Sequence, residues 1–183
     1  MNALQFVQTA KQWETVPEQS VCVTEYDHFK TKNFTNSTNG AIKFKTTGCR
    51  NEQNEVRFIE HVQLVLDIEA DVRGHISLWL ESPEGTLSQL ISPRPLDVTD
   101  EGFKQWPFTT VHMWGENPSG VWTLHVHNGN LWKGLQSNIS IKTIKLVIFG
   151  TKQAPLHYME PRKYRTLMNI AEKTPISLKP QEM

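Results

Sequence analysis

The sequence has little cysteine, no net charge and no long hydrophobic run. Two of its 183 residues are cysteine, so at most one internal disulfide can form, and a disulfide-dense scaffold is excluded. Basic and acidic residues number 19 each, which excludes the basic excess that binds nucleic acid or acidic membrane surfaces. No apolar stretch approaches the ~20 residues that cross a bilayer. We therefore expect no nucleic-acid partner and no membrane span.

A secretory signal peptide is also missing from the first ten residues, which have no basic region, apolar core or cleavage signature. The body of the chain nevertheless has features of a secreted protein. Sequons begin at Asn33, Asn36 and Asn138, and Cys22 and Cys49 can form one bridge in an oxidising compartment. We expect a C-terminal part of a larger protein of the secretory pathway or extracellular space.

Short catalytic motifs are absent too: there is no Gly-x-Ser-x-Gly, no His-Glu-x-x-His and no glycine-rich phosphate loop. The most enzyme-like feature is His125-x-His127, because residues i and i+2 of a strand point the same way and two imidazoles can share a metal. The alternating apolar residues Trp122, Leu124 and Val126 are expected to face the core. Both histidines are therefore expected to face solvent.

Two further groups of residues carry possible chemistry. His112 stands between bulky apolar residues, and we expect it to be a buried, hydrogen-bonded histidine within a strand. Asp97, Asp100 and Glu101 cluster in one loop and have oxygens of the kind that Ca²⁺ prefers. No EF-hand spacing supports a calcium site there, and acidic residues in loops are usually solvated.

The chain divides into three zones. In residues 1–16, apolar residues recur every three positions from Leu4 to Ala10, which predicts a short amphipathic helix followed by a linker. Ten residues are too few for a helix to be stable alone, so it belongs to something larger. Residues 17–151 have the pattern of a β domain. Residues 152–183 are rich in proline and poor in apolar periodicity, which predicts a disordered tail.

The β pattern is an alternation in which every second residue is apolar over Val62–Ile68, Ile76–Leu80 and Trp122–Val126. Alternation of this kind is typical of antiparallel sheets with one buried face. Turn-forming sequences such as Ser82–Gly85 and Asn117–Gly120 separate the segments. Seven or so strands with these turns predict an all-β fold, an antiparallel β-sandwich or jelly roll.

Aromatic residues concentrate in the predicted loop Glu101–Phe108. They either plug the end of the sandwich or form a docking surface, because aromatic residues dominate the cores of interfaces. The N-terminal helix carries an apolar strip that a free-standing β domain does not need. The candidate interface residues of both segments are Leu4, Phe6, Val7, Trp13, Phe103, Trp106 and Phe108.

Residues 72–91, 97–124 and 146–151 together resemble a known family. Their motifs include Val72-Arg73-Gly74-His75-Ile76, Ser82-Pro83-Glu84-Gly85-Thr86 and His112-x-Trp114-Gly115-Glu116-Asn117-Pro118. The pattern is similar to the P domain, or Homo B domain, that follows the catalytic domain of kexin- and furin-type proprotein convertases. Residues 13–18 are most similar to the neuroendocrine branch. Residues 2–13 resemble the last helix of the family's subtilisin-like domain.

The resemblance implies an eight-stranded jelly roll, a Cys22–Cys49 bridge and a non-catalytic role. The family's whole enzyme is a Ca²⁺-dependent serine endoprotease that cleaves precursors after paired basic residues in the trans-Golgi or in secretory granules. Its P domain packs on the catalytic domain in cis and is needed for stability and for the response to pH and Ca²⁺. The catalytic residues and the calcium belong to the part missing here, so no cofactor is expected in this chain.

One departure concerns the turn Arg73-Gly74-His75, where the family usually has Arg-Gly-Asp. The departure implies that a nearby base loses its carboxylate partner and that sensitivity to pH differs, because histidine titrates between pH 5 and 8. Two alternatives remain. One is a stand-alone secreted β-sandwich that binds a ligand such as a glycan, and the other is a metal-dependent hydrolase that uses His125 and His127.

Overall fold

The computed structural model describes residues 2–13, 15–26, 30–35, 39–129 and 137–155. Within them lie one α-helix, one 3₁₀ turn and nine strands, where the resemblance implies eight. In chain order they are α1 (Ala3–Lys11), β1 (Gln19–Glu25), β2 (Lys32–Thr35), β3 (Asn39–Thr46), β4 (Phe58–Ala70), η1 (Arg73–His75), β5 (Ile76–Glu81), β6 (Leu87–Ile91), β7 (Phe103–Thr110), β8 (Gly120–Asn128) and β9 (Asn138–Thr151).

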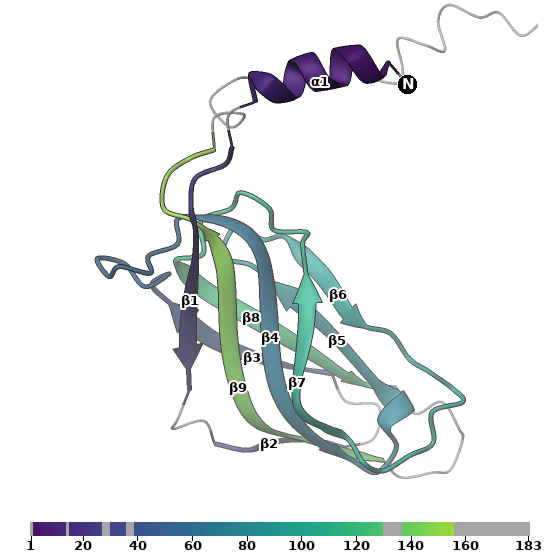
Figure 1. Cartoon of the computed structure of the whole chain (residues 1–183). Coiled ribbons are helices and arrows are strands. Elements are labelled where there is room, and N and C mark those ends of the chain that lie inside the picture. The colour runs from purple at the N-terminus through teal and green to yellow at the C-terminus, as the bar shows by residue number, and fades with distance from the viewer. Residues whose placement is uncertain (1, 14, 27–29, 36–38, 130–136, 156–183) are drawn as a thin grey trace, which may run out of the picture.

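The strands form two antiparallel sheets that pack face to face (Figure 1). The five-stranded sheet has the order β1-β9-β4-β7, and the short β2 also pairs with β9. The four-stranded sheet has the order β3-β8-β5-β6. The predicted all-β antiparallel sandwich is confirmed. No helix in the described part of the chain is long and apolar enough to cross a membrane.

The core lies between the sheets and consists of alternate residues of the central strands. Leu64 and Leu66 of β4 are fully buried, and so are Trp122 and Leu124 of β8. Burying each such side chain contributes ~1.5–3 kcal/mol relative to exposing it. The indole N–H of Trp122 donates to the carbonyl oxygen of Pro118 at 2.9 Å, so the largest core residue keeps its polar atom paired.

The N-terminal helix α1 forms where the apolar spacing predicts it. Asn2 caps it, because its side-chain oxygen accepts from the backbone N–H of Gln5 at 3.2 Å. None of its residues is buried, and in Figure 1 the helix stands away from the sandwich. Its apolar side chains are therefore available for packing against something else.

Two local predictions are wrong. The aromatic segment is not a loop, since Phe103 begins strand β7. The strand includes Pro107, which is tolerated because β7 is an edge strand of its sheet. Phe103 and Phe108 are buried, as a plug of the sandwich requires. His112 is not in a strand either, because β7 ends at Thr110 and the histidine is exposed in the turn that follows.

A disulfide joins Cys22 in β1 to Cys49 in the loop after β3, with the two Cα atoms 5.6 Å apart. The bridge implied by the resemblance is confirmed. Because β1 and β3 belong to different sheets, the bond ties the two layers together near one edge.

Replacing both cysteines with alanine is expected to lower the free energy of unfolding by at least about 3–4 kcal/mol, because the bridge closes a loop of 27 residues in the unfolded chain. Urea unfolding of the variant and of the oxidised protein measures the difference. Unfolding of the unmutated protein in reductant is the control that leaves the side-chain volume in place. An unchanged urea midpoint would contradict a stabilising bridge.

His75 makes stability depend on pH. It is fully buried at the end of η1, and burial lowers its pKa below the ordinary value of 6.5. As the pH falls below about 6.5, the unfolded chain binds a proton at this histidine that the folded chain does not bind. The free energy of unfolding therefore decreases toward lower pH and loses this dependence above about 6.5.

We expect the urea midpoint to fall between about pH 7.5 and about pH 5.5, a range above the titration of most carboxylates. The variant His75→Gln removes the titrating group and should show a smaller fall over the same range. An identical slope in both proteins would assign the pH dependence to other groups.

Candidate functional site

The turn Arg73-Gly74-His75 is held in place by the loop that follows β6. The backbone N–H of Gly74 donates to the carbonyl oxygen of Asp97 at 2.8 Å, and the N–H of Arg94 donates to the carbonyl of Gly74 at 2.8 Å. A Cβ at Gly74 would lie 2.1 Å from the Arg94 carbonyl oxygen. The close approach of two backbones therefore requires glycine here.

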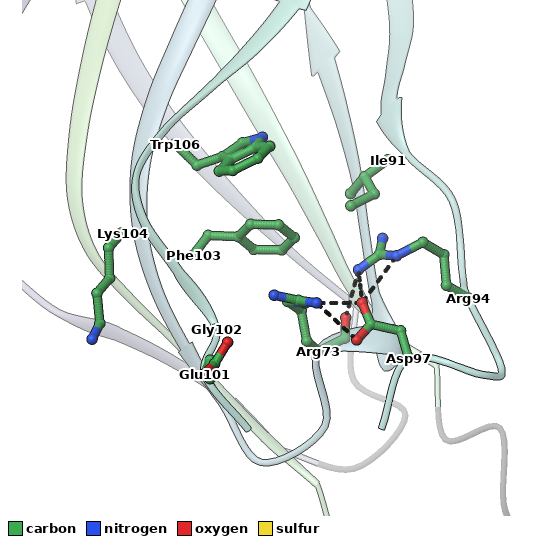
Figure 2. Close-up of a pocket in the computed structure, with 9 residues that line it drawn as sticks. All are labelled: Arg73, Ile91, Arg94, Asp97, Glu101, Gly102, Phe103, Lys104 and Trp106. Atoms are coloured by element: carbon green, nitrogen blue, oxygen red, sulfur yellow. Dashed lines mark hydrogen bonds and ion pairs between the residues drawn. The ribbon is translucent and has the colours of Figure 1, made fainter. Parts of the chain in front are cut away.

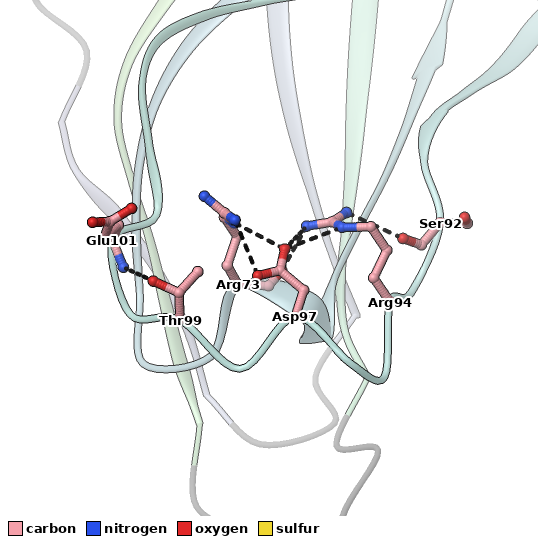
Figure 3. Close-up of polar contacts among 6 residues, drawn as sticks. All are labelled: Arg73, Ser92, Arg94, Asp97, Thr99 and Glu101. Carbon is pink, nitrogen blue, oxygen red and sulfur yellow. Dashed lines mark hydrogen bonds and ion pairs between the residues drawn. The ribbon is translucent and has the colours of Figure 1, made fainter.

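The side chains of this turn and loop form an Arg–Asp–Arg cluster (Figure 3). Asp97 accepts two hydrogen bonds from Arg73, at 2.9 and 3.1 Å. It also accepts from Nε and Nη2 of Arg94, at 3.2 and 2.8 Å. Bidentate arginine–carboxylate pairs are strong and geometrically specific. Two guanidinium groups thus share one carboxylate, which leaves an excess of positive charge.

These contacts perturb both ionisable partners. The hydrogen bond from Arg73 is the main cause that lowers the pKa of Asp97, and Arg94 lowers it further. The same hydrogen bond raises the pKa of Arg73. Asp97 therefore stays ionised and Arg73 stays charged. Arg73 has a carboxylate partner in Asp97 although the turn has His75 where the family usually has aspartate.

Aromatic rings of β7 line the same site. The guanidinium carbons of Arg73 and Arg94 lie 5.6 and 5.7 Å from the centre of the Phe103 ring, within the range of a cation–π contact. Phe103 in turn contacts Trp106 and Phe108, with ring centres 5.9 and 5.1 Å away. The two arginines are therefore fixed by the carboxylate and by the ring.

A groove of about 610 Å³ opens beside this cluster (Figure 2). Two sheet edges, the loop and the turn contribute to it. Its lining has three basic and two acidic side chains, together with apolar and aromatic groups. The lining residues are Arg73, Ile91, Arg94, Asp97, Glu101, Gly102, Phe103, Lys104 and Trp106.

The sequence identified only part of this site. Arg73 and Gly74 belong to the family motif, and Phe103 and Trp106 were interface candidates. Arg94 and Ile91 were missed, because nothing in their local sequence indicates that they face β7. Their positions depend on the pairing of distant strands.

The acidic loop does not gather a metal site. The carboxylate of Asp97 is occupied by two arginines, and the backbone N–H of Glu101 donates to the hydroxyl of Thr99 at 3.3 Å. Within the described residues, no group of three or more His, Cys, Asp or Glu side chains is placed to hold a metal ion.

His125 and His127 lie on the outer face of β8, as the alternation predicts. The imidazole of His125 makes a hydrogen bond of 2.8 Å with the Glu81 carboxylate, and His127 makes one with the side chain of Asn39. Each histidine thus has a separate protein partner. This arrangement gives no support to the hydrolase alternative.

Two of the three sequons lie side by side in the five-stranded sheet. Asn33 in β2 is opposite Ser140 in β9, whose hydroxyl makes a 2.7 Å hydrogen bond to the Asn33 side-chain oxygen. Asn138 begins β9, and its amide donates to Asp71 at 2.8 Å. Both asparagines are exposed and therefore accessible to modification. Glycosylation at these positions stays a prediction. Asn36 lies outside the described residues.

The interface candidates lie at two ends of the sandwich. Gln19 at the start of β1 and Phe58 at the start of β4 both pair with Thr151, so the chain enters and leaves at this end. Phe103 pairs with Ile68 near the far end of β4. At ~3.3 Å per residue, Ile68 is about 33 Å along the strand from Phe58. The aromatic residues of β7 therefore do not extend the apolar strip of α1.

Other exposed apolar residues lie at the end where the chain enters. The backbone N–H of Gly115 donates to the Ile59 carbonyl at 2.6 Å, which places the turn after β7 beside the start of β4. Val111 and Trp114 are exposed here, and Trp114 is 51% exposed. We use the name chain-entry surface for the exposed apolar residues at this end, which are Trp13 and Val16 ahead of β1 and Val111 and Trp114 in the turn after β7. Of these, only Trp13 was among the predicted interface residues.

Comparisons with known proteins agree on one family. The family model of the proprotein convertase P-domain matches residues 59–147. Proprotein convertase subtilisin/kexin type 5 of Rattus norvegicus is 37% identical over 159 residues, which cover 85% of this chain and 9% of that protein. Furin-like protease 1 of Drosophila melanogaster is 35% identical over 84% of this chain and 12% of its own length. Neuroendocrine convertase 2 of Mus musculus is 35% identical over 94% of this chain and 27% of its own length.

The chain thus spans about a tenth to a quarter of the length of these relatives. Among solved structures, the serine protease of Aeromonas sobria in complex with its chaperone has a similar fold, with a TM-score of 0.53. That match has 13% identity and covers 80% of this chain and 29% of the other, so it supports the fold alone. The matched family segment contains the Arg73-Gly74 turn and the His112–Trp114 motif. The β-sandwich of this chain is therefore a P domain of the proprotein convertase family.

Proposed function

We propose that this chain is the P-domain portion of a longer subtilisin-like proprotein convertase, in which it stabilises and regulates the catalytic domain of the same polypeptide. The observation that carries the proposal is the P-domain match over residues 59–147. In this proposal residues 17–151 are the P domain, residues 1–16 are the last helix of the catalytic domain with its linker, and residues 152–183 are a tail. The P domain takes no part in the chemistry of cleavage.

The proposal includes the activity of the whole enzyme. The enzyme cleaves precursors after paired basic residues, depends on calcium bound by its catalytic domain, and acts in the secretory pathway. The names of the relatives, which are proprotein convertases and furin-like proteases, support this activity. The Cys22–Cys49 disulfide and the exposed sequons support an oxidising compartment.

The helix α1 supports docking in cis. Its apolar side chains Leu4, Phe6 and Val7 are exposed, and none of its residues is buried. Apolar surface of a few hundred Å² usually marks an interaction site, and covering it contributes several kcal/mol at ~25 cal/mol per Å². We propose that these side chains pack inside the catalytic domain.

The chain-entry surface continues this contact onto the sandwich. Trp13 is 71% exposed, and Trp114 lies at the same end of the domain. Large aromatic side chains are the commonest anchors of protein interfaces. We propose that Trp13 and Trp114 are anchors between the two domains.

The isolated chain is expected to lack endopeptidase activity. Incubation with a fluorogenic peptide ending in Lys-Arg or Arg-Arg, with and without Ca²⁺, should release no more fluorophore than a buffer blank. Activity that survives serine-protease inhibitors directed at contaminants would overturn the non-catalytic role.

Trp114→Ala in the full-length convertase is expected to weaken domain docking by about 2 kcal/mol, the scale of an interface anchor. The yield of active enzyme and its thermal inactivation temperature should both fall, whereas the same change in the isolated chain should leave unfolding nearly unchanged. Trp106→Ala is the matched control, since Trp106 is 52% exposed at the opposite end. Equal losses from both variants would contradict docking at the chain-entry surface.

A further inference from the structure

The groove beside Phe103 lies where the two sheets separate at their edges. β6 is an edge of the four-stranded sheet and β7 is an edge of the five-stranded sheet. A 2.7 Å hydrogen bond between the hydroxyls of Ser88 and Thr110 joins the two strands near the chain-entry end. At the other end Figure 2 shows Ile91 across from Phe103 and Trp106. The open part of the cleft is therefore remote from the proposed docking surface.

The geometry of the groove suits an extended peptide. In the described part of the chain β7 pairs only with β4, so its outer edge borders the groove. Extended segments bind along such edges, and alternate side chains enter the pockets beside them. Pro107 has no backbone N–H, which restricts edge pairing to the first residues of β7.

The charge of the groove favours a carboxylate. The Arg73 and Arg94 side chains remain 30% and 32% exposed although both contact Asp97. The shared carboxylate and the Phe103 ring hold both guanidinium groups in place, so a ligand does not bear the entropy cost of ordering them. Guanidinium groups present a donor geometry that matches carboxylates. With Lys104 and Glu101 included, the lining has one positive charge in excess.

The walls of the groove are apolar. Trp106 is half exposed on one side and Ile91 lies on the other. On the adjacent loop Leu96 is 96% exposed and Val98 is also exposed. Exposed apolar residues around a preordered charged centre are typical of a recognition site for a short segment.

We propose that this groove binds an extended segment of a partner protein in which a single glutamate or aspartate is flanked by bulky apolar residues. The carboxylate is expected to contact Arg73 and Arg94, and the apolar side chains to pack on Trp106 and Ile91. A strongly acidic segment fits less well, because Glu101 lies beside the groove. The chain's own residues 156–183 also fit poorly, since their basic residues outnumber the acidic ones by five to three.

Fluorescence polarisation with the intact 183-residue chain tests the proposal. The probe is a fluorescein-labelled peptide, Gly-Ser-Leu-Phe-Glu-Leu-Phe-Gly-Ser with a blocked C-terminus, and its partner has Gln in place of Glu. The Glu peptide is expected to bind about tenfold more tightly, as for a charge-assisted hydrogen-bonded pair. Added salt should weaken the binding of the Glu peptide more than the binding of the Gln peptide.

Two variants locate the binding site. Trp106→Ala should weaken binding of the Glu peptide about tenfold, the effect of removing an interface anchor. Trp114→Ala is the matched control, because the exposed fractions of the two tryptophans are 52% and 51%. Arg94→Gln should remove the preference of the chain for the Glu peptide over the Gln peptide. In this variant Arg73 still pairs with Asp97. Thermal unfolding of each variant checks that the sandwich is intact.

Several results would overturn the proposal. The first is equal affinity for the Glu and Gln peptides. The second is a loss of Glu-peptide affinity in Trp114→Ala as large as that in Trp106→Ala. The third is no peptide binding at a chain concentration of about 1 mM. Trp106-dependent sedimentation with phosphatidylcholine–phosphatidylserine vesicles, without peptide binding, would instead assign the surface to membranes. The inference does not depend on the proposed function, since docking in cis is tested at Trp114 and peptide binding at Trp106.

Discussion

The antiparallel ladder between β4 and β9 is the interaction on which the rest of the structure depends. It runs from the pair Phe58–Thr151 to the pair Ala70–Ile139, nearly the full length of both strands. β1 and β2 attach to β9, and β7 attaches to β4. The inward residues of the two strands form one half of the core. Because the ladder spans the sandwich, it also separates the chain-entry surface from the groove.

An irregularity in the neighbouring ladder, between β4 and β7, shapes the groove. The register of β4 against β7 shifts between Leu66 and Ile68, and Gln105 opposite this shift has a left-handed φ of 43°. Its backbone N–H donates to Asp67 at 2.6 Å. Burial raises the pKa of Asp67, but hydrogen bonds from Thr143 and Gln105 outweigh burial and lower it. The carboxylate therefore stays charged and holds the bulge.

A bulge of this kind bends a strand and changes the direction of the next side chains. Gly102 contributes to the same bend, because its φ is +64° and a Cβ there would lie 2.0 Å from the Ile68 carbonyl oxygen. Phe103 is thereby buried beneath the arginines, while Trp106 remains at the margin of the core. The groove is thus a product of backbone irregularity in an edge strand.

These irregularities also mark the limit of what the sequence predicts. Alternation depends on local spacing alone, so it placed Trp122 in the core and His125 on the surface. The same reasoning failed for 103–108, because Pro107 and the bulge disrupt the period within one strand. The pairing of Asp97 with Arg73 has no local signal, since Arg73 is 24 residues away in the chain and is positioned by backbone contacts of η1.

The pairing of Gln19 with Thr151 has a mechanical consequence. The chain enters the sandwich at Gln19 and leaves it at Thr151, and these two residues are paired at the same edge. Tension between the flanking segments therefore separates β1 from β9 one residue pair at a time. Three pairs open before the strain reaches Cys22. There the covalent bond to Cys49 transfers the load to the opposite sheet, and the remainder of β1 is shielded from the pull.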